Sequence, residues 1–244
     1  MKIVLIGYGK MGHVIERIAV ARGHDVVLTI DAGQEDRFDS DLFRSADVAI
    51  EFTRPEAAFA NCSRCMDRSV PVVCGTTGWG EHLPVLEERC RHEGKTLFWA
   101  SNFSIGVNLF FALNRAFARL MSTQPQYRPH LTETHHVHKL DAPSGTAITL
   151  AEGLIANTPA LDAWRLTEKP ATNELPITAV REGEVPGTHT ISYTSPVDRL
   201  TIRHEAFGRE GFAHGAVLAA EYAVEHSGFL TMNDLISNTT DNTI

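Results

Sequence analysis

The chain has 244 residues, which is enough for one large domain or two modest ones. Its 43% hydrophobic and 21% charged residues are typical of a globular protein and exclude a disordered or fibrous chain. The net charge of -8, with no basic patch, argues against nucleic acid and anionic membranes as partners. No apolar run is long enough to span a membrane and the N-terminal one is short, so we expect a cytoplasmic protein.

The first part of the chain, residues 1–104, alternates short apolar runs with longer amphipathic ones. This rhythm predicts βαβ units that feed a parallel sheet. The expected strands cover residues 2–7, 25–31, 46–53, 70–77 and 96–102. The expected helices cover residues 11–19, 55–68 and 81–94.

After residue 104 the pattern changes to an apolar helix at 108–121 and a polar-faced strand at 128–136. A helix at 146–156 and half-buried strands at 177–183, 188–195 and 199–207 follow, whereas residues 157–176 look like a loop. The last apolar helix, 213–226, could pack back on the first domain. The predicted fold class is α/β, with a doubly wound Rossmann domain (1–104 plus 214–244) and an α+β domain on a mixed or antiparallel sheet (105–213).

Four cysteines raise the question of a metal or redox site. Cys62 and Cys65 form a CxxC within a predicted helix, and Cys74 and Cys90 are isolated. No second CxxC accompanies them, so we interpret all four as reduced, partly buried thiols. A structural or redox pair remains the alternative.

A glycine-rich turn follows the first predicted strand. In "IGYGKMG", Gly7, Gly9 and Gly12 stand in GxGxxG spacing at the start of a helix. In a dinucleotide site the three glycines serve the tight turn, the approach to a pyrophosphate, and the packing of helix on sheet. The helix N–H groups then hold the phosphates. The predicted cofactor-binding residues of this turn are Gly7, Tyr8, Gly9, Lys10, Met11 and Gly12; a glycine-rich turn without a ligand is the alternative.

The end of the second strand carries a carboxylate. Asp31 lies about 20 residues beyond the turn, where an acidic residue accepts a hydrogen bond from a ribose hydroxyl. The next residue is Ala32, and the nearest arginine downstream is Arg37. A carboxylate without an adjacent arginine repels a 2'-phosphate, so we predict NADH as the preferred cofactor. NADPH stays open, because Lys10 could pair with a phosphate.

Two further strand ends are expected at the cofactor, because ligands bind beyond the carboxyl ends of parallel strands. The first offers flexible backbone and hydroxyl groups, and the second an amide and an aromatic ring near the nicotinamide. The predicted residues are Gly75, Thr76 and Thr77, and Ala100, Ser101, Asn102 and Phe103.

The stretch "THHVHKLDAPSGTA", residues 134–147, holds three histidines and a lysine in five positions. If residues 131–137 form a strand, His136 and His138 share one face at roughly 6.6 Å, and His135 and Lys139 lie on the other. Zinc would need a third ligand, and a protonated lysine beside it would oppose the cation. We therefore predict no metal site here. Two other interpretations remain: a polar strand end whose histidines are purely structural, and an acid/base site.

An acid/base site gains support from the next residues. Ser144 can cap the helix that follows, and Gly145 and Thr146 would then present N–H groups to an anion. We therefore predict that Ser144, Gly145 and Thr146 bind a substrate carboxylate. One short segment thus supplies a lysine, a titratable imidazole and a place for a carboxylate, which suits a small dicarboxylic substrate. For His135 and Lys139 to touch one small ring, the strand must end and bend between them.

The run "HHVHKLDAPSGTA" resembles the 4-hydroxy-tetrahydrodipicolinate reductase (dihydrodipicolinate reductase) family. So do "GYGKMG", "EFTRPEA", "CGTTGW" and "ASNFSIGVN", which occur in the same order as in that family. The resemblance implies an oxidoreductase of the diaminopimelate route of lysine biosynthesis. Many members have a longer glycine turn with an arginine at the position of Lys10, and an arginine directly after the ribose-binding acid.

The resemblance also implies roles and an assembly. It makes His135 and Lys139 catalytic, as proton donor or acceptor and as proton donor, and His136, Gly145 and Thr146 substrate contacts. It implies a catalytic domain whose open sheet builds a homotetramer, with the C-terminal helix closing the Rossmann domain. Two other functions stay open: a Rossmann reductase for another small acid, and an NAD-binding sensor without catalysis.

Overall fold

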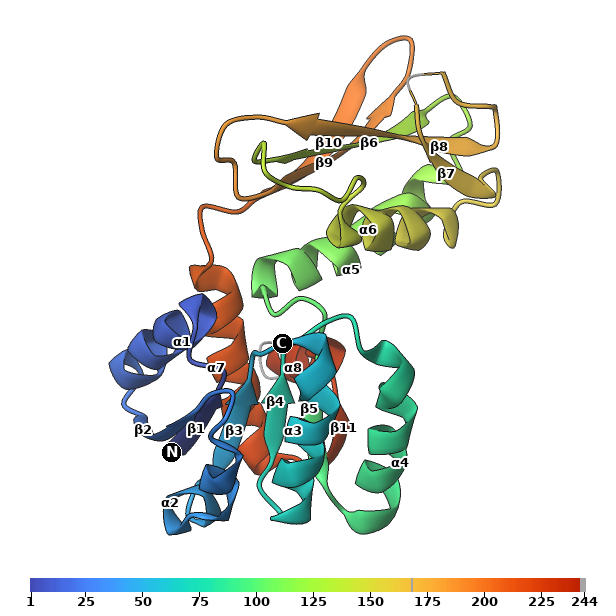
Figure 1. The fold of residues 1–244 in the computed structure, drawn as a ribbon. Coiled ribbons are helices and arrows are strands. Elements are labelled where there is room, and N and C mark those ends of the chain that lie inside the picture. The colour runs from blue at the N-terminus through green and yellow to red at the C-terminus, as the bar shows by residue number, and fades with distance from the viewer. Residues whose placement is uncertain (168, 242–244) are drawn as a thin grey trace. The chain divides into compact units, whose positions relative to one another are not determined.

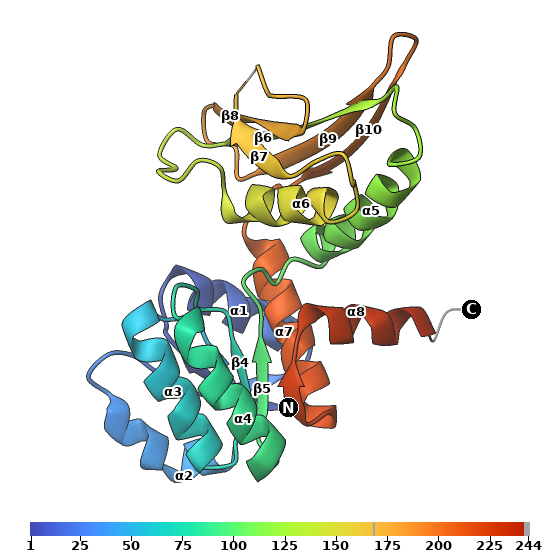
Figure 2. The same cartoon turned by 90° about the vertical axis from the view of Figure 1, so that its right-hand side faces the viewer.

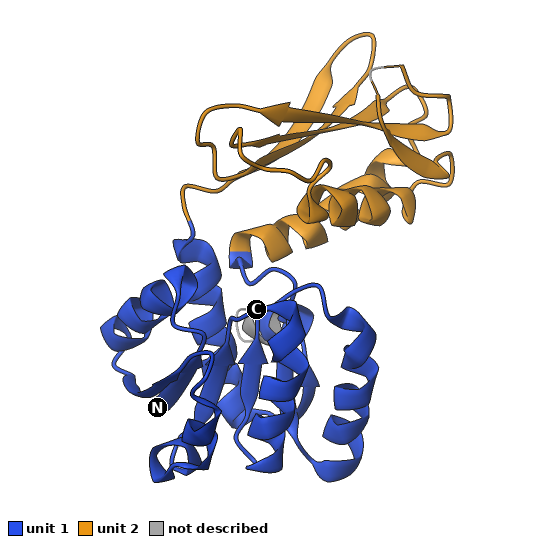
Figure 3. Ribbon diagram, in the orientation of Figure 1, with its two compact units in different colours: residues 1–105, 209–244 blue, residues 106–208 orange. Residues whose placement is uncertain are grey.

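The computed structural model describes residues 1–167 and 169–241, so residues 242–244 of the predicted first domain lie outside the described residues. The chain forms two compact units, Met1–Ile105 with Arg209–Ile244 and Gly106–Gly208 (Figure 3). The second unit ends five residues earlier than the predicted bound of 213. The difference arises because helix α7 (Glu210–Glu225) starts early and buries Ala213 in the core of the first unit.

The first unit contains a six-stranded sheet in the order β11-β5-β4-β3-β1-β2 (Figure 1). All neighbouring strands are parallel. Because the chain runs from β1 to β2 on one side and continues with β3 on the other, the order reverses between β1 and β3. The strands are β1 (Lys2–Ile6), β2 (Asp25–Ile30), β3 (Val48–Glu51), β4 (Val72–Cys74), β5 (Thr96–Trp99) and β11 (Gly228–Leu230).

Helices cover both faces of this sheet, as the doubly wound class requires (Figures 1 and 2). Helices α1 and α7 bury one apolar face with the sheet, and α3 and α4 bury the other. Pro55 begins α3, where its missing N–H would have no helical partner. The helices of this unit are α1 (Lys10–Ala21), α2 (Asp41–Arg44), α3 (Pro55–Asp67), α4 (Leu83–Glu93), α7 and α8 (Met232–Asp241), with 3-10 turns at Glu35–Asp39 and Gly80–His82.

The four cysteines are free and lie in the core that α3 and α4 form with the sheet. The sequence predicts partly buried thiols, whereas in the structure all four are fully buried. Burial raises the pKa of the Cys65 and Cys74 thiols well above their usual value. These thiols therefore pack as small apolar side chains.

The second unit contains a five-stranded mixed sheet in the order β10-β9-β6-β8-β7. β6 pairs parallel with β8 and antiparallel with β9, so β6 lies in the middle of the sheet. The strands are β6 (Arg128–His135), β7 (Ala163–Leu166), β8 (Glu174–Arg181), β9 (Thr188–Thr194) and β10 (Arg199–Glu205).

Two helices, α5 (Ile105–Met121) and α6 (Gly145–Ile155), pack on one face of this sheet (Figure 2). Their apolar stripes meet Leu131 of β6 and Ile191 of β9 in a single core. The alternate positions Thr132 and Thr190 point to the other face and are half-buried. No helix of residues 106–167 and 169–208 covers that polar face (Figure 1).

The structure corrects the prediction of a loop at residues 157–176. β7 and the first residues of β8 lie within that range. β7 has an exposed, polar pattern because it is an edge strand paired only with β8 among the described strands, so no alternation of buried residues marked it. None of the described helices is both long and apolar enough to cross a bilayer.

Candidate active site

The glycine turn between β1 and α1 has the geometry that its spacing predicted. Gly7 adopts φ +91°, and a Cβ on it would lie 2.1 Å from the carbonyl oxygen of Phe52. A Cβ on Gly12 would lie 2.5 Å from the carbonyl oxygen of Gly7, so α1 approaches the turn closely. A Cβ on Gly9 would meet nothing within 4 Å. Gly9 thus leaves open space at the start of α1, which has no side-chain cap.

A pocket of about 300 Å³ opens beside this turn, at the point where the strand order reverses. Gly7, Gly9 and Asp31, three of the predicted cofactor contacts, line it. The Asp31 carboxylate accepts a hydrogen bond from the backbone N–H of Tyr8 at 3.1 Å and is otherwise exposed. Glu35 also lines the pocket; nothing in the sequence pattern had marked this second carboxylate.

A second pocket, of about 330 Å³, lies at the ends of β4 and β5. Phe52 lines both pockets, so the two are neighbours. Arg209 and Phe212 line it too; sequence reasoning missed them because they come from the start of α7, far along the chain. Six of its other lining residues were predicted cofactor contacts: Met11, Gly75, Thr77, Ser101, Asn102 and Phe103.

The remaining predicted cofactor residues lie next to the pockets without lining them. Thr76 is buried, and its hydroxyl donates to the buried carboxylate of Glu51 at 2.7 Å. Lys10 is exposed at the start of α1. The hydroxyl of Tyr8 donates a hydrogen bond to the carboxylate of Glu16. The other two, Gly12 and Ala100, are buried.

This part of the chain fits a dinucleotide. The glycine cradle leaves room that any larger residue at position 9 would fill, and the uncapped start of α1 faces it. The acidic side chains in the first pocket suit ribose hydroxyls.

The histidine-rich stretch starts at the end of β6. The strand ends at His135, one residue before the predicted bound of 136, because Val137 and His138 form a turn. Within the turn, the N–H of Val137 donates to the carbonyl oxygen of Gly183 at 3.1 Å. His136 and His138 therefore do not share a strand face, and the chain bends between His135 and Lys139 as the acid/base interpretation required.

Lys139 is held by a nearby carboxylate. Its Nζ lies 2.7 Å from Oδ1 of Asp141. This hydrogen bond lowers the pKa of Asp141. His138 extends into solvent, where its Nε2 lies 3.2 Å from Oε1 of Glu184, so its partner belongs to the surface and not to the site.

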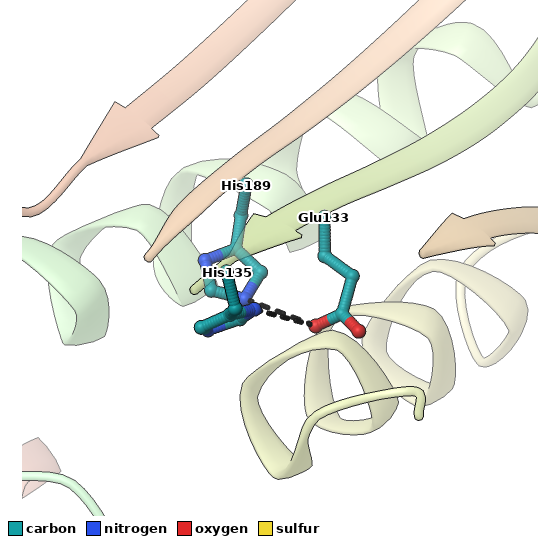
Figure 4. Close-up of side chains that lie close together, drawn as sticks. All are labelled: Glu133, His135 and His189. Carbon is teal, nitrogen blue, oxygen red and sulfur yellow. Dashed lines mark ion pairs between the residues drawn. The ribbon is translucent and has the colours of Figure 1, made fainter. Parts of the chain in front are cut away.

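A buried carboxylate lies beside His135. Glu133, two residues earlier on β6, is fully buried, and its Oε2 lies 3.3 Å from Nδ1 of His135 and 3.9 Å from Nε2 of His189 on β9 (Figure 4). The backbone N–H of Ser144 donates to both Glu133 oxygens at 3.1 Å, and Nη2 of Arg181 on β8 lies 3.2 Å from Oε1. One carboxylate therefore joins three strands and the start of α6.

Protonation follows from these contacts. Burial by itself would raise the pKa of Glu133, but its contacts with His135, Ser144 and Arg181 lower that pKa to about 2. Burial, followed by the electrostatic effect of the neighbouring His135, lowers the pKa of His189 to about 4. At neutral pH the site therefore holds a charged carboxylate next to a neutral His189 imidazole.

Ser144 caps α6 as predicted: its hydroxyl accepts a hydrogen bond from the N–H of Ala147 at 3.2 Å. The same oxygen lies 3.2 Å from Nε2 of His189, and Ser144 is buried. Gly145 at the first helical position is exposed, with open space where a Cβ would be. The helix start thus presents Gly145, and Thr146 next to it, while Ser144 supports them from below.

Glu133, His135 and His189 offer one ligand atom each within 4.8 Å of one another. A metal would have to compete with the Arg181 guanidinium and the Ser144 N–H for the same carboxylate. The arrangement is better suited to hold a proton-transfer group in place than to hold a cation.

Both units match known families. The family model "Dihydrodipicolinate reductase, N-terminus" matches residues 1–103, and "Dihydrodipicolinate reductase, C-terminus" matches residues 106–236. The chain belongs to the dihydrodipicolinate reductase family. A 4-hydroxy-tetrahydrodipicolinate reductase of Christiangramia forsetii is 45% identical over 238 residues, which cover 98% of each chain. One from Staphylococcus haemolyticus is 33% identical and covers 96% of this chain and 100% of its own.

Solved structures support the same fold. A dipicolinate-bound dihydrodipicolinate reductase from Paenisporosarcina superimposes with a TM-score of 0.75 at 23% identity, covering 96% of this chain and 99% of its own. An amine dehydrogenase from Mycobacterium smegmatis gives a TM-score of 0.54 at 10% identity over 96% of this chain and 95% of its own. The likeness to the amine dehydrogenase concerns the fold alone.

Proposed function

We propose that this chain reduces 4-hydroxy-tetrahydrodipicolinate to tetrahydrodipicolinate with NADH or NADPH, in the diaminopimelate route of lysine biosynthesis. The observation that carries the proposal is the position of His135 at the end of β6, beside the open start of α6. This arrangement offers a proton-transfer group next to a place for a carboxylate, and the named relatives of the family carry out the same reaction.

The cofactor site belongs to the first unit. Bound NADH or NADPH supplies the hydride. Gly7, Gly9 and the start of α1 hold the pyrophosphate, and Asp31 accepts from the ribose. The strand-end residues 75–77 and 100–103 hold the nicotinamide half in the second pocket.

The substrate site belongs to the second unit. Gly145 and Thr146 bind one carboxylate of the cyclic substrate, His136 contacts the ring, and Lys139 leaves Asp141 to bind substrate and donate a proton. The 4-hydroxyl leaves as water together with a hydrogen of the adjacent ring carbon, C4 accepts the hydride, and the His135 and Lys139 site returns one proton to that adjacent carbon. One substrate, one reduced cofactor and one proton thus give tetrahydrodipicolinate, oxidised cofactor and water.

NADH is the preferred cofactor in this proposal. Asp31 and Glu35 line the first pocket, and two carboxylates repel a 2'-phosphate. Arg37 donates to the carbonyl oxygen of Thr29 at 2.6 Å, so its guanidinium is engaged on the backbone. The cations that could favour NADPH are Arg54, which lines the pocket, and Lys10.

The proposed assembly is a cytoplasmic homotetramer built on the open sheet of the second unit. The supporting observation is the half-buried row of threonines on the face opposite α5 and α6. A polar face of this kind can contact a second copy of the chain without exposing an apolar patch on the monomer. Light scattering of the purified chain is expected to give four times the 26.9 kDa of the monomer; a monomer would contradict the assembly.

The test is a coupled assay in which dihydrodipicolinate synthase supplies the substrate and NADH oxidation is followed by absorbance. We expect turnover with NADH, weaker turnover with NADPH, and no loss of either after treatment with a chelator. A reductase for another small acid would ignore this substrate, and a sensor would bind NADH without turnover. Either result would reject the proposed reaction.

A further inference from the structure

We infer that Glu133 is a positioning residue of the acid/base site: its carboxylate holds the Nδ1–H of His135 and thereby leaves Nε2 of His135 to exchange the proton. The inference rests on the proposed function for the role of His135. It adds a residue that lies just before the histidine-rich stretch. Glu133 is fully buried.

The first step is the geometry around Nδ1. Oε2 of Glu133 lies 3.3 Å from this nitrogen, and no described residue gives Nδ1 an aligned hydrogen bond. Contacts of this kind tighten when substrate binds, since catalytic hydrogen bonds are often long and poorly aligned without it. A carboxylate next to one imidazole nitrogen favours the proton on that nitrogen.

The second step is why Glu133 is fixed and charged. Ser144 N–H donates to both of its oxygens, and Arg181 lies beside Oε1. These donors keep the carboxylate ionised and prevent it from rotating away, so Oε2 stays directed toward His135 (Figure 4). The same contacts tie Glu133 to the start of α6, where the substrate carboxylate is proposed to bind.

The third step is the opposite side of the ring. A Cβ on Gly187 would lie 3.1 Å from Nε2 of His135 and 3.4 Å from its Cδ2. Gly187 adopts φ +155°, a conformation that larger residues rarely take. The missing side chain therefore leaves space next to the nitrogen that we assign to proton exchange.

The histidine that lies nearest cannot take over this role. The His189 ring centroid lies 5.2 Å from that of His135 in an edge-on arrangement. Its Nε2 lies within reach of the Ser144 hydroxyl and 3.9 Å from Glu133. His189 thus lies beside the Glu133 carboxylate. Among the described contacts, Glu133 is the negatively charged acceptor nearest to Nδ1 of His135.

The first test needs no substrate, and its reading of the wild-type chain does not depend on the activity of any variant. ¹⁵N NMR of protein labelled at histidine reports which ring nitrogen of neutral His135 carries the proton, with the signal assigned by its loss in His135→Asn. We expect the Nδ1–H tautomer in the wild-type chain and a mixture in Glu133→Gln, which keeps the size but removes the charge. An Nε2–H tautomer in the wild-type chain, or no change in E133Q, would overturn the inference.

The second test separates positioning from folding. E133Q is expected to lower kcat about 10²-fold while the KM for substrate changes little and NADH affinity is unchanged. The matched control is Glu184→Gln, which removes the carboxylate of an exposed glutamate–histidine pair, and it should behave like the wild-type chain. Equal losses in both variants, or full kcat in E133Q, would reject the role of Glu133. A wild-type chain without turnover would instead reject the proposed reaction and leave the NMR result standing.

Discussion

Nη2 of Arg181 lies 3.2 Å from Oε1 of Glu133, and the two side chains come from adjacent parallel strands. The same Arg181 nitrogen donates to the carbonyl oxygen of Asp141 at 2.6 Å. One guanidinium therefore connects the buried carboxylate beside His135 with the loop that carries Lys139. Loss of Arg181 would leave the buried Glu133 carboxylate without its cation, which is costly.

Lys139→Ala is expected to reduce turnover by about 10² to 10⁴-fold, because it removes a proton donor and a cation next to the proposed substrate carboxylates. The affinity for NADH should remain, since the cofactor pockets are lined only by residues of the first unit. Steady-state kinetics and fluorescence titration with NADH measure the two effects. The control is Lys169→Ala, at an exposed lysine of the same unit; turnover of K139A equal to that control would remove Lys139 from the mechanism.

Ala32→Arg is expected to improve kcat/KM for NADPH about tenfold relative to NADH, because a guanidinium beside Asp31 can pair with the 2'-phosphate. Ala32 lines the first pocket and is exposed, so the longer side chain can extend without displacing the core. Ala21→Arg places the same charge on the exposed end of α1, outside both pockets, and should leave the ratio unchanged. An unaltered ratio in A32R would argue against Asp31 as the residue that selects the cofactor.

The stability of the chain is expected to fall as the pH is lowered from about 6.5 to about 4, because of His189. Its folded pKa is lowered to about 4, so the unfolded chain binds more protons in this range and protonation favours unfolding. The loss can reach about 3 kcal/mol. Denaturant unfolding at several pH values should show a smaller loss in His189→Asn, while His214→Asn, at an exposed histidine, keeps the wild-type dependence. Equal pH dependence in H189N and the wild-type chain would contradict the assignment.

Gly187→Ala and Gly183→Ala form a matched pair. Both glycines have positive φ, but a Cβ on Gly183 would meet nothing within 4 Å, whereas one on Gly187 would press on His135. Both variants should lose about 1 to 3 kcal/mol of stability. Only G187A should also lose turnover at a temperature where both are folded, so equal kcat values in the two variants would show that the space beside His135 is not needed.

The local parts of the fold and of the site could be predicted from sequence. GxGxxG spacing after an apolar strand determines a turn whose contacts form within a few residues, and the structure has that turn with Gly7 and Gly12 in close contact. The cap at Ser144 is equally local. Family membership, which rests on such motifs, was identified correctly.

Other parts depend on contacts that a linear pattern does not contain. The Glu133 contacts with Arg181 and His189 join positions about fifty residues apart through strand pairing, and only the register of β6 with β8 and β9 brings them together. The strand was predicted too long because the bond between Val137 and Gly183 also crosses from one segment to another. Short or exposed strands such as β7 and β11 bury too little for hydrophobic periodicity to mark them.

The most direct measurement of the proposed reaction follows a labelled hydride. NADH carrying deuterium at the transferred position is incubated with the chain and 4-hydroxy-tetrahydrodipicolinate, and the product is examined by NMR and mass spectrometry. The expected result is tetrahydrodipicolinate with one deuterium per molecule, located at C4. Deuterium at another carbon, or unlabelled substrate together with unconsumed NADH, would contradict the assignment of this chain as a 4-hydroxy-tetrahydrodipicolinate reductase.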